Sequence, residues 1–446
     1  MRPLLRFFVL IWLLGTGPAH SDNPVLDIQI ITTPSGVTAW LMSDSTVPVI
    51  TMRFAFPGGA ALDPVGKEGL ARLLAATMDE GAGDLDSQAF QGALEDKSIQ
   101  ISFSANKDML TGRLVTLSRN RDTAFDLLHL AITDPRFDPE PVERMKNALM
   151  ASRRSSLGHP DTLAGWHLNS AVYADHPYAM PILGGRCSLS GLTANDLQAA
   201  HGRLVTRDGL LVTVAGDIGA DELAAKLEAV FSRSPKTGRA AIPPVPAHPN
   251  ETILVPFAGP QSTIRFAQEG VKPDNPDFIT SLVLNHILGG GMKSRLMKGL
   301  RAGDGSTYGA WTVPIRRHDA ALWLGGVATA NDKVADILER LRTIWRQVAE
   351  GGVTEDEVAL SRSVLTGGFF LRMATTGGIA DLMLGYRLDG FSPSDLNAFP
   401  ARMASVTAAD VSDVARRCLD PAMLTTVIVG TPEGVEADRQ TEIDPF

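Results

Sequence analysis

The chain repeats itself at a spacing of nearly half its length, and this duplication limits its fold more than any other feature. Each half contains a strand-like segment, then a helix that opens with the Thr-x-x-Asp spacing of a capping box, then an apolar run that ends in Gly. The first two features recur at offsets of 212 and 214 residues. Three features in one order at nearly one offset predict two homologous domains. The paired segments are Thr51–Ala55 and Thr263–Ala267, Leu192–Leu197 and Val406–Val411, and Leu210–Gly216 and Leu424–Gly430.

A proline-rich stretch separates the two halves. Pro243, Pro244 and Pro246 lie within it, and such a stretch suits an extended linker because proline cannot continue a helix. Helix-like and strand-like segments occur in both halves without strict alternation, which favours an α+β fold in which each domain is an antiparallel sheet packed with helices. The predicted helices include 124–132 and 334–348. We therefore expect an N-terminal domain at 22–234, a linker at 235–250 and a C-terminal domain at 251–446.

The first 21 residues have the pattern of an export signal. Arg2 and Arg6 precede the apolar run Phe7–Leu14, and Ala19–Ser21 has the small-x-small form of a cleavage site. We expect a periplasmic protein that starts near Asp22; an uncleaved anchor is the alternative. Loss of the two arginines takes the formal net charge from −9 to −11, which gives no reason to expect nucleic acid as a partner.

The chain contains two cysteines, Cys187 and Cys418, which is too few for a disulfide framework. An exported protein reaches an oxidising compartment, so a single long-range bridge between them is one interpretation. Two separate buried thiols are the simpler one, and we expect it.

Several short motifs, taken in order, make the chain similar to the M16 (pitrilysin/insulinase) peptidase family, and in particular to its short-chain M16B-type members. The resemblance covers nearly the whole chain after residue 21. It implies two homologous domains that form one half of a clamshell, which pairs with a second chain of the same family. The motifs are Arg53–Gly59, Gly69–Ala71, His176–Tyr178, Pro181–Gly184, Leu288–Gly291, Ser294–Leu296 and Leu300–Tyr308.

The resemblance also identifies a zinc site that this sequence lacks. Active members carry His-x-x-Glu-His directly after the Gly69–Ala71 motif, and these positions are Arg72, Ala75 and Ala76 here. Neither Arg nor Ala can ligate zinc, and Ala cannot act as a base. The family's carboxylate ligand, expected 70 to 80 residues later, falls in Lys146–Leu157, which contains no Asp or Glu. We expect no metal in this chain, with zinc held by a partner subunit.

Three other histidines are candidates for a different metal site. They lie near one another in the sequence, at His159, His167 and His176, but none has a ligand-type partner at helical spacing. We interpret His176, which precedes Pro177, as a structural loop residue.

In the second half, Arg301 and Tyr308 match a pair that in the family reaches the substrate at the partner's zinc. The resemblance assigns them substrate binding and catalysis, because a phenol and a guanidinium can stabilise the charge that develops on a peptide carbonyl oxygen. Asp304 departs from relatives that have a basic residue there. Gly289–Gly291 is not a phosphate loop, because Met292 stands directly before Lys293; we expect a helix end and a close backbone approach.

The sequence therefore favours the zinc-free subunit of a heterodimeric peptidase that binds peptide and is inactive alone. The alternative is an inactive scaffold or peptide-binding protein with the same fold. A self-sufficient peptidase has little support.

Overall fold

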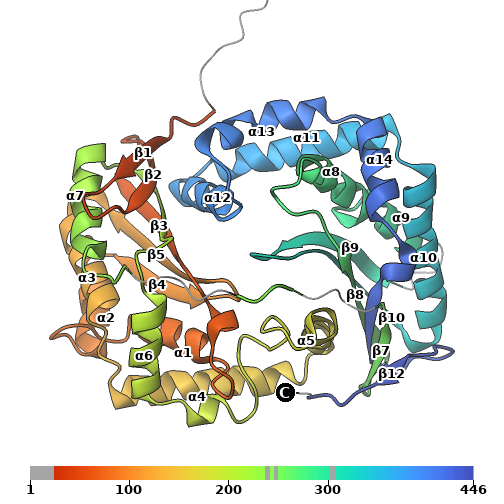
Figure 1. Cartoon of the computed structure of the whole chain (residues 1–446), viewed down its shortest axis with the longest axis horizontal. Helices are drawn as coiled ribbons and strands as arrows, with labels where there is room; N and C mark the ends of the chain where they lie inside the picture. Colours follow the sequence, from red (N-terminus) through yellow and green to blue (C-terminus); the bar gives the residue numbers. More distant parts are fainter. Residues whose placement is uncertain (1–24, 237–241, 246–249, 302–306, 445) are drawn as a thin grey trace, which may run out of the picture.

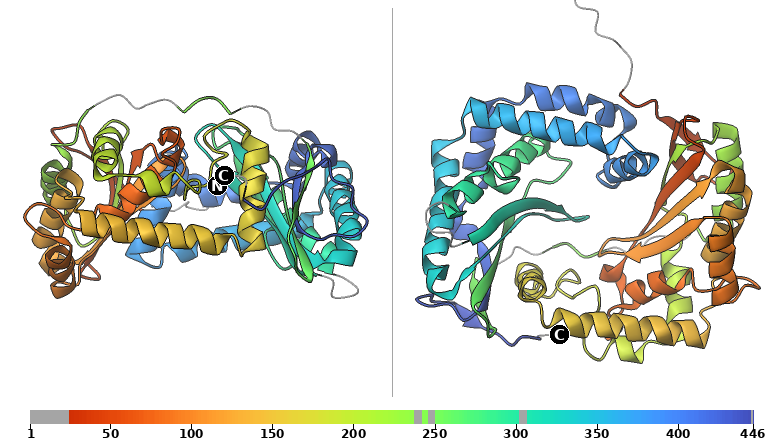
Figure 2. Two further views of the ribbon diagram at one scale, coloured as in Figure 1. Left: turned by 90° about the horizontal axis from the view of Figure 1, so that it is seen from below. Right: turned by 180° about the vertical axis from the view of Figure 1, so that it is seen from behind.

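The computed structural model describes residues 25–236, 242–245, 250–301, 307–444 and 446. The predicted export signal and parts of the predicted linker lie outside the described residues. Within them, the strands form two six-stranded sheets that face each other across a flattened ring of helices (Figures 1 and 2). This arrangement confirms the α+β prediction.

The N-terminal sheet has the strand order β1-β2-β6-β3-β5-β4. All neighbours are antiparallel except β2 and β6, which are parallel. The sheet is thus antiparallel as predicted, apart from this one parallel pair. Helices α1, α2, α3, α6 and α7 cover its outer face, and α4 runs along one side of the ring (Figure 1). The elements are β1 Gln29–Thr32, β2 Thr38–Ser43, β3 Val49–Pro57, α1 Leu70–Thr77, α2 Ser87–Asp96, β4 Gln100–Ala105, β5 Met109–Leu117, α3 Arg121–Thr133, α4 Pro139–Ser156, α5 Pro160–Tyr173, α6 Ala194–Leu204, β6 Leu211–Gly216 and α7 Ala220–Phe231.

The C-terminal sheet repeats this design with the order β12-β7-β11-β8-β10-β9. Here β7 is parallel to both β11 and β12, and the remaining pairs are antiparallel. The elements are β7 Thr252–Pro256, β8 Gln261–Glu269, α8 Phe278–Gly289, α9 Arg295–Arg301, β9 Thr307–Arg316, β10 Ala321–Ala330, α10 Val334–Gly351, α11 Glu355–Arg372, α12 Thr376–Leu388, α13 Pro393–Ser405, α14 Ala408–Cys418, β11 Thr425–Gly430 and β12 Arg439–Gln440.

The structure bears out the repeated segments in detail. Thr193 and Thr407 open α6 and α14 with complete capping boxes, and the apolar runs that end in Gly are β6 and β11. The repeated strands β3 and β8 also share a packing arrangement, in which a Phe ring lies over a Gly of the neighbouring strand. Phe54 on β3 lies opposite Gly112 on β5, and a Cβ at Gly112 would come within 1.9 Å of the Phe54 ring. Phe266 and Gly325 form the matching pair on β8 and β10, with a corresponding distance of 2.1 Å.

Each half contributes one helix to the inner face of the other half's sheet. Helix α12 packs on β3 and β6, where the Thr213 hydroxyl donates to the Ala380 carbonyl at 2.9 Å. Helix α5 packs on β8 and β11 of the opposite sheet. An ion pair anchors α12, from Arg53 on β3 to Asp381 at 2.5 Å, and α5 is anchored through Arg265 on β8 and Asp161. Neither inner face is complete without the other half.

The apolar cores follow this exchange of helices. One cluster fills the N-terminal half and a second fills the C-terminal half, while a third joins α5 to β7, β8 and β11. Cys187 and Cys418 are separate thiols, as expected, but the prediction that both are buried is wrong, because Cys187 is exposed and Cys418 is half-buried. In the part of the chain that the structure describes, no helix is long and apolar enough to cross a membrane.

Candidate functional site

Helix α1 begins at a tight turn that a buried carboxylate holds in place. Gly69 adopts a φ of 98°, a left-handed conformation that favours glycine. The two Asp63 carboxylate oxygens accept hydrogen bonds from the backbone N–H groups of Gly69 and Ala71, each at 2.9 Å. Burial raises the pKa of the Asp63 carboxyl to about 7, although these hydrogen bonds lower it. The helix therefore starts where the Gly69–Ala71 motif predicts.

The three positions that carry zinc chemistry in active relatives lie on α1 with no donor for a metal. Ala75 is buried in the core with a relative exposure of 1%, whereas Arg72 and Ala76 are half-buried. The neighbouring helix α4 contains most of Lys146–Leu157, which offers no carboxylate. No group of three His, Cys, Asp or Glu side chains that could hold a metal occurs among the described residues. The residues present do not fit a zinc ion.

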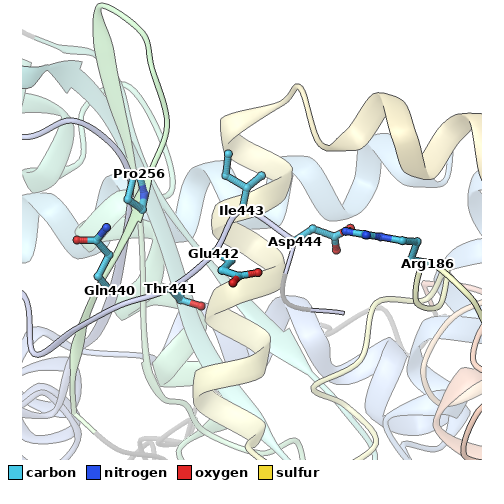
Figure 3. Close-up of a pocket in the computed structure, with 7 residues that line it drawn as sticks. All are labelled: Arg186, Pro256, Gln440, Thr441, Glu442, Ile443 and Asp444. Carbon is cyan, nitrogen blue, oxygen red and sulfur yellow. The ribbon is translucent and has the colours of Figure 1, made fainter.

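In place of a carboxylate, this stretch of α4 presents a buried cation. Two Arg153 nitrogens donate to the two carboxylate oxygens of Asp444, at 2.7 and 3.0 Å, and a third donates to the Gly184 carbonyl. Burial raises the pKa of Asp444, but the hydrogen bond and charge of Arg153 outweigh it, so the pKa lies below its ordinary value. Figure 3 shows Arg186 directed toward the same carboxylate. The C-terminal segment is thereby tied to the first half of the chain.

The three candidate histidines do not assemble a metal site. His159 is exposed immediately before α5, and His167 is buried on that helix with its Nε2 at 3.3 Å from the Ile443 carbonyl oxygen. Burial lowers the pKa of His167 and favours its neutral form. His176 is buried, with Nε2 at 2.8 Å from the Pro243 carbonyl oxygen. The structural interpretation of His176 is confirmed.

The His176–Tyr178 motif belongs to a polar cluster at the tip of the β4–β5 hairpin. The Tyr178 hydroxyl donates to Asp108, and its backbone N–H donates to His176 Nδ1 at 3.1 Å. The Lys107 ammonium donates to the carbonyl oxygens of Pro177 and Met180. Burial lowers the pKa of Lys107 to about 8. These contacts hold the loop after α5 against the N-terminal sheet.

The structure brings the Arg301 and Tyr308 positions to adjoining ends of two elements. Arg301 is the last residue of α9 and is exposed, whereas Tyr308 is the second residue of β9. The Thr307 hydroxyl donates to the Leu300 carbonyl at 3.3 Å, which joins the residues next to both positions. Asp304 lies outside the described residues.

The three glycines after α8 have the structural role that the sequence predicts. A Cβ at Gly289 would lie 2.4 Å from the backbone nitrogen of Thr312, so only glycine allows α8 to approach β9 this closely. Asn285, one turn earlier, donates to the Thr312 carbonyl at 3.3 Å. The end of α8 therefore covers the outer edge of β9.

One further feature was not predicted from the sequence, a cavity of about 820 Å³ beside this contact. Residues from α8, α9, β9, α11, α12 and α13 line it. The one signal in the sequence was an apolar residue on α11, Val364, which lines the cavity and is exposed.

Comparison with known proteins agrees with these observations. Residues 191–365 match the family described as "Peptidase M16 inactive domain". The chain is thus similar to the M16 peptidase family. The "Non-peptidase homolog YmxG" of Helicobacter pylori is 24% identical over 331 residues, which cover 74% of this chain and 77% of the relative. The "Uncharacterized zinc protease YmxG" of Bacillus subtilis is 21% identical over 364 residues, or 80% and 89% of the two chains.

Solved structures show the same fold. A peptidase M16 inactive domain from Pseudomonas fluorescens has a TM-score of 0.86 and 24% identity, and the match covers 92% of this chain and all of that one. A protease from Helicobacter pylori has a TM-score of 0.82 and 16% identity, over 91% and 100% of the two chains. The fold is therefore that of these structures, and the matched family description, an inactive M16 domain, agrees with the residues on α1.

Restoring the family motif by Arg72→His, Ala75→Glu and Ala76→His is expected to yield neither stoichiometric zinc nor zinc-dependent peptide cleavage. The stretch of α4 beside α1 still lacks a carboxylate ligand, and the new Glu at position 75 would lie in an apolar core, where an unpaired carboxylate is destabilising. Elemental analysis and a peptidase assay, with the wild-type chain as the control, test this. One tightly held zinc per variant chain together with robust cleavage would contradict it.

Proposed function

We propose that the chain is the zinc-free subunit of a heterodimeric M16 peptidase. The observation that carries this proposal is the contrast between two corners of the fold. Helix α1 has lost every zinc-chemistry residue, whereas the corner between α9 and β9 retains the Arg301 and Tyr308 positions. A partner with His-x-x-Glu-His would supply the zinc, and this chain would complete the chamber.

In this proposal Arg301 and Tyr308 act on the substrate carbonyl. Peptide hydrolysis places negative charge on the carbonyl oxygen, and fixed donors stabilise that charge more strongly in the transition state than in the ground state. The Arg301 guanidinium can also hold the substrate before reaction, because its fork of donors matches carbonyl and carboxylate oxygens. Tyr308 would donate its phenol hydrogen to the same oxygen.

The face of the N-terminal sheet that is turned toward the other half offers a surface for a peptide. The inner face of β4 and β5 carries exposed Gln100, Ser102, Ser104 and Arg113, whereas the alternate residues of β4 are buried toward the helices. Helix α12 covers β3 and β6 but leaves these two strands uncovered (Figure 1). Polar side chains and an available cation suit the backbone carbonyls and acidic groups of a peptide.

We further propose that the chain works in the periplasm, after removal of residues 1–21. The expected partner is an exported chain of similar length with His-x-x-Glu-His, and the neighbouring reading frame is the first place to look for it. Size-exclusion chromatography of the two purified chains tests the pairing, with a complex of one copy each as the expected result. Separate elution at micromolar concentration would count against the heterodimer.

A second candidate function is a scaffold or peptide-binding protein that retains the fold without contributing to catalysis. The name of the Helicobacter pylori relative, a non-peptidase homolog, favours this candidate. The two functions differ in one measurable respect. If this chain takes part in catalysis, substitution of Arg301 changes the turnover of the two-chain complex. If the chain is a scaffold, the substitution leaves turnover unchanged and affects only how well the complex forms.

A further inference from the structure

The cavity of about 820 Å³ in the C-terminal half has the size of a ligand site. Helices α8, α9, α11, α12 and α13 contribute residues to its lining together with strand β9 (Figure 1). The lining reaches the contact between the two halves, because it includes Asp381, which accepts hydrogen bonds from Arg53 on β3. A peptide that lies between the two sheets is therefore close to this cavity.

The charges of the lining leave one cation without a partner. Each of the three aspartates in the lining has an arginine beside it, in the pairs Arg53–Asp381 at 2.5 Å, Arg316–Asp389 at 2.9 Å and Arg402–Asp395 at 4.0 Å. Arg372, the last residue of α11, also lines the cavity, and its guanidinium forms no ion pair or hydrogen bond with the residues that the structure describes. The lining thus has one unbalanced positive charge, which an anionic group would neutralise.

A phenol hydroxyl in the same wall is also without a partner. The Tyr386 hydroxyl is accessible and forms no hydrogen bond within the described part of the chain. Burial raises the pKa of this phenol, so it retains its hydrogen and can donate it. Three cations and one acid act on the phenol, namely Arg402, Asp389, Arg316 and Arg372. This wall therefore suits a carboxylate, which accepts hydrogen bonds from both a phenol and a guanidinium.

Much of the remaining lining is apolar, and some of it is exposed. The rings of Tyr386 and Phe391 pack with their centroids 5.6 Å apart. Val313 on β9 and Val364 on α11 line the cavity with relative exposures of 39% and 48%. An occupant that neutralises Arg372 is therefore expected to carry a large apolar group beside its carboxylate.

Strand β9 connects the cavity to the corner where the Arg301 and Tyr308 positions lie. Tyr308 is the second residue of β9, and residues 311–314 of the same strand line the cavity. Val313 follows Tyr308 by five residues, which is about 17 Å along an extended strand. A peptide held at that corner reaches the cavity with about five of its own residues, so we expect the occupant to be part of a peptide rather than a free small molecule.

We propose that the cavity binds a peptide segment in which an acidic side chain stands next to a large apolar residue. The peptide carboxylate would accept hydrogen bonds from Arg372 and Tyr386, and the apolar side chain would pack against the aromatic wall. The inference rests on the proposed peptide binding and names the class of peptide. It requires neither the zinc-bearing partner nor the action of Arg301 and Tyr308.

Two substitutions in the lining and one outside it form a matched set. Arg372→Gln removes the charge and retains a polar side chain, whereas Tyr386→Phe removes only the hydroxyl. Arg346→Gln on α10 is the control, because Arg346 is an exposed cation outside the lining. All three variants should fold, since none of them removes a side-chain hydrogen bond or ion pair among the described residues.

Calorimetric titration of the isolated chain with acetyl-Ala-Leu-Glu-Phe-Ala-amide, whose only charge is the Glu side chain, tests the proposal. Replacing Glu by Gln in the peptide should weaken binding about tenfold, the effect of losing a hydrogen bond between charged groups. Arg372→Gln should weaken binding of the Glu peptide about tenfold and leave that of the Gln peptide nearly unchanged, because both changes remove the same contact. Tyr386→Phe should weaken binding of the Glu peptide by a smaller factor, and Arg346→Gln should leave it unchanged.

Three results would overturn the proposal: no binding of the Glu peptide, equal affinity for the Glu and Gln peptides, or equal affinity of Arg372→Gln and the wild-type chain for the Glu peptide. Laurate that competes with the peptide and binds more tightly would also overturn it, because the cavity would then serve a free long-chain acid. All titrations use the isolated chain. A failure to pair with a zinc-bearing subunit would therefore leave this result unaffected, and the two proposals can fail separately.

Discussion

Tyr308→Phe in the assembled two-chain peptidase is expected to lower turnover by about 10²-fold with little change in KM, because removal of a single oxyanion donor has effects of this size. The substitution removes one hydroxyl and retains the ring, so folding and pairing should be preserved. Steady-state kinetics with a peptide substrate measures the effect. The separation of turnover from KM identifies a contact that strengthens in the transition state.

Arg301→Ala in the same complex should raise KM as well as lower turnover, since the guanidinium also holds the ground-state substrate. Lys298→Ala is the matched control, because Lys298 is an exposed cation one turn earlier on α9. This control should behave like the wild-type chain. Full activity of both Tyr308→Phe and Arg301→Ala would show that the chain takes no part in catalysis and acts as a scaffold.

Arg153→Ala is expected to lower the free energy of unfolding by about 3–5 kcal/mol, the range for removing one partner of a buried ion pair. The Arg153 side chain is 5% exposed and the Asp444 side chain 9%, so the substitution leaves a buried carboxylate whose remaining cation is the exposed Arg186 at 3.7 Å. Denaturant unfolding of the isolated chain measures the loss. Arg154→Ala, at the exposed neighbouring position on α4, should have little effect.

The double variant Arg153→Ala with Asp444→Ala distinguishes the cost of an unpaired charge from the loss of side-chain packing. It should be less destabilised than Arg153→Ala alone, because the carboxylate that loses its partner is also gone. An unchanged free energy of unfolding in Arg153→Ala would mean that the C-terminal segment is not held to α4 in solution.

The duplicated architecture could be predicted from sequence because its signals are local. The capping boxes at Thr193 and Thr407 and the apolar strands β6 and β11 each depend on a few neighbouring residues. The parallel pairing of β2 with β6 could not be predicted, because Ala39 and Val212 are partners that lie far apart in the chain. Local patterns indicate hairpin neighbours but not which distant strand completes a sheet.

The packing of α5 and α12 on the sheet of the other half could not be predicted for a related reason. A helical pattern shows that one face is apolar but not which sheet covers it, and Asp161 and Asp381 read as ordinary surface acids. The cavity could not be predicted either, because six separate elements contribute residues to it.

The absent zinc ligands were the most direct functional prediction, because α1 depends on a local motif. The structure supplies a reason to expect that a few substitutions will not restore the site. Ala75 is part of the core, and the neighbouring stretch of α4 offers no carboxylate and has its Arg153 bound to Asp444. The residues that differ from a zinc site therefore lie on α1 and α4, and α4 is bound to the C-terminal segment.

The proposal that this chain and a zinc-bearing partner form one peptidase is best tested by measuring peptidase activity after the two purified chains are mixed. Each chain is assayed alone and then together over a range of ratios, with a zinc chelator as the control. We expect little cleavage by either chain alone. We expect the mixture to show a large gain in peptidase activity that saturates at a ratio of one to one and is lost when the chelator is added. A zinc-bearing chain that is equally active with and without this subunit would contradict it.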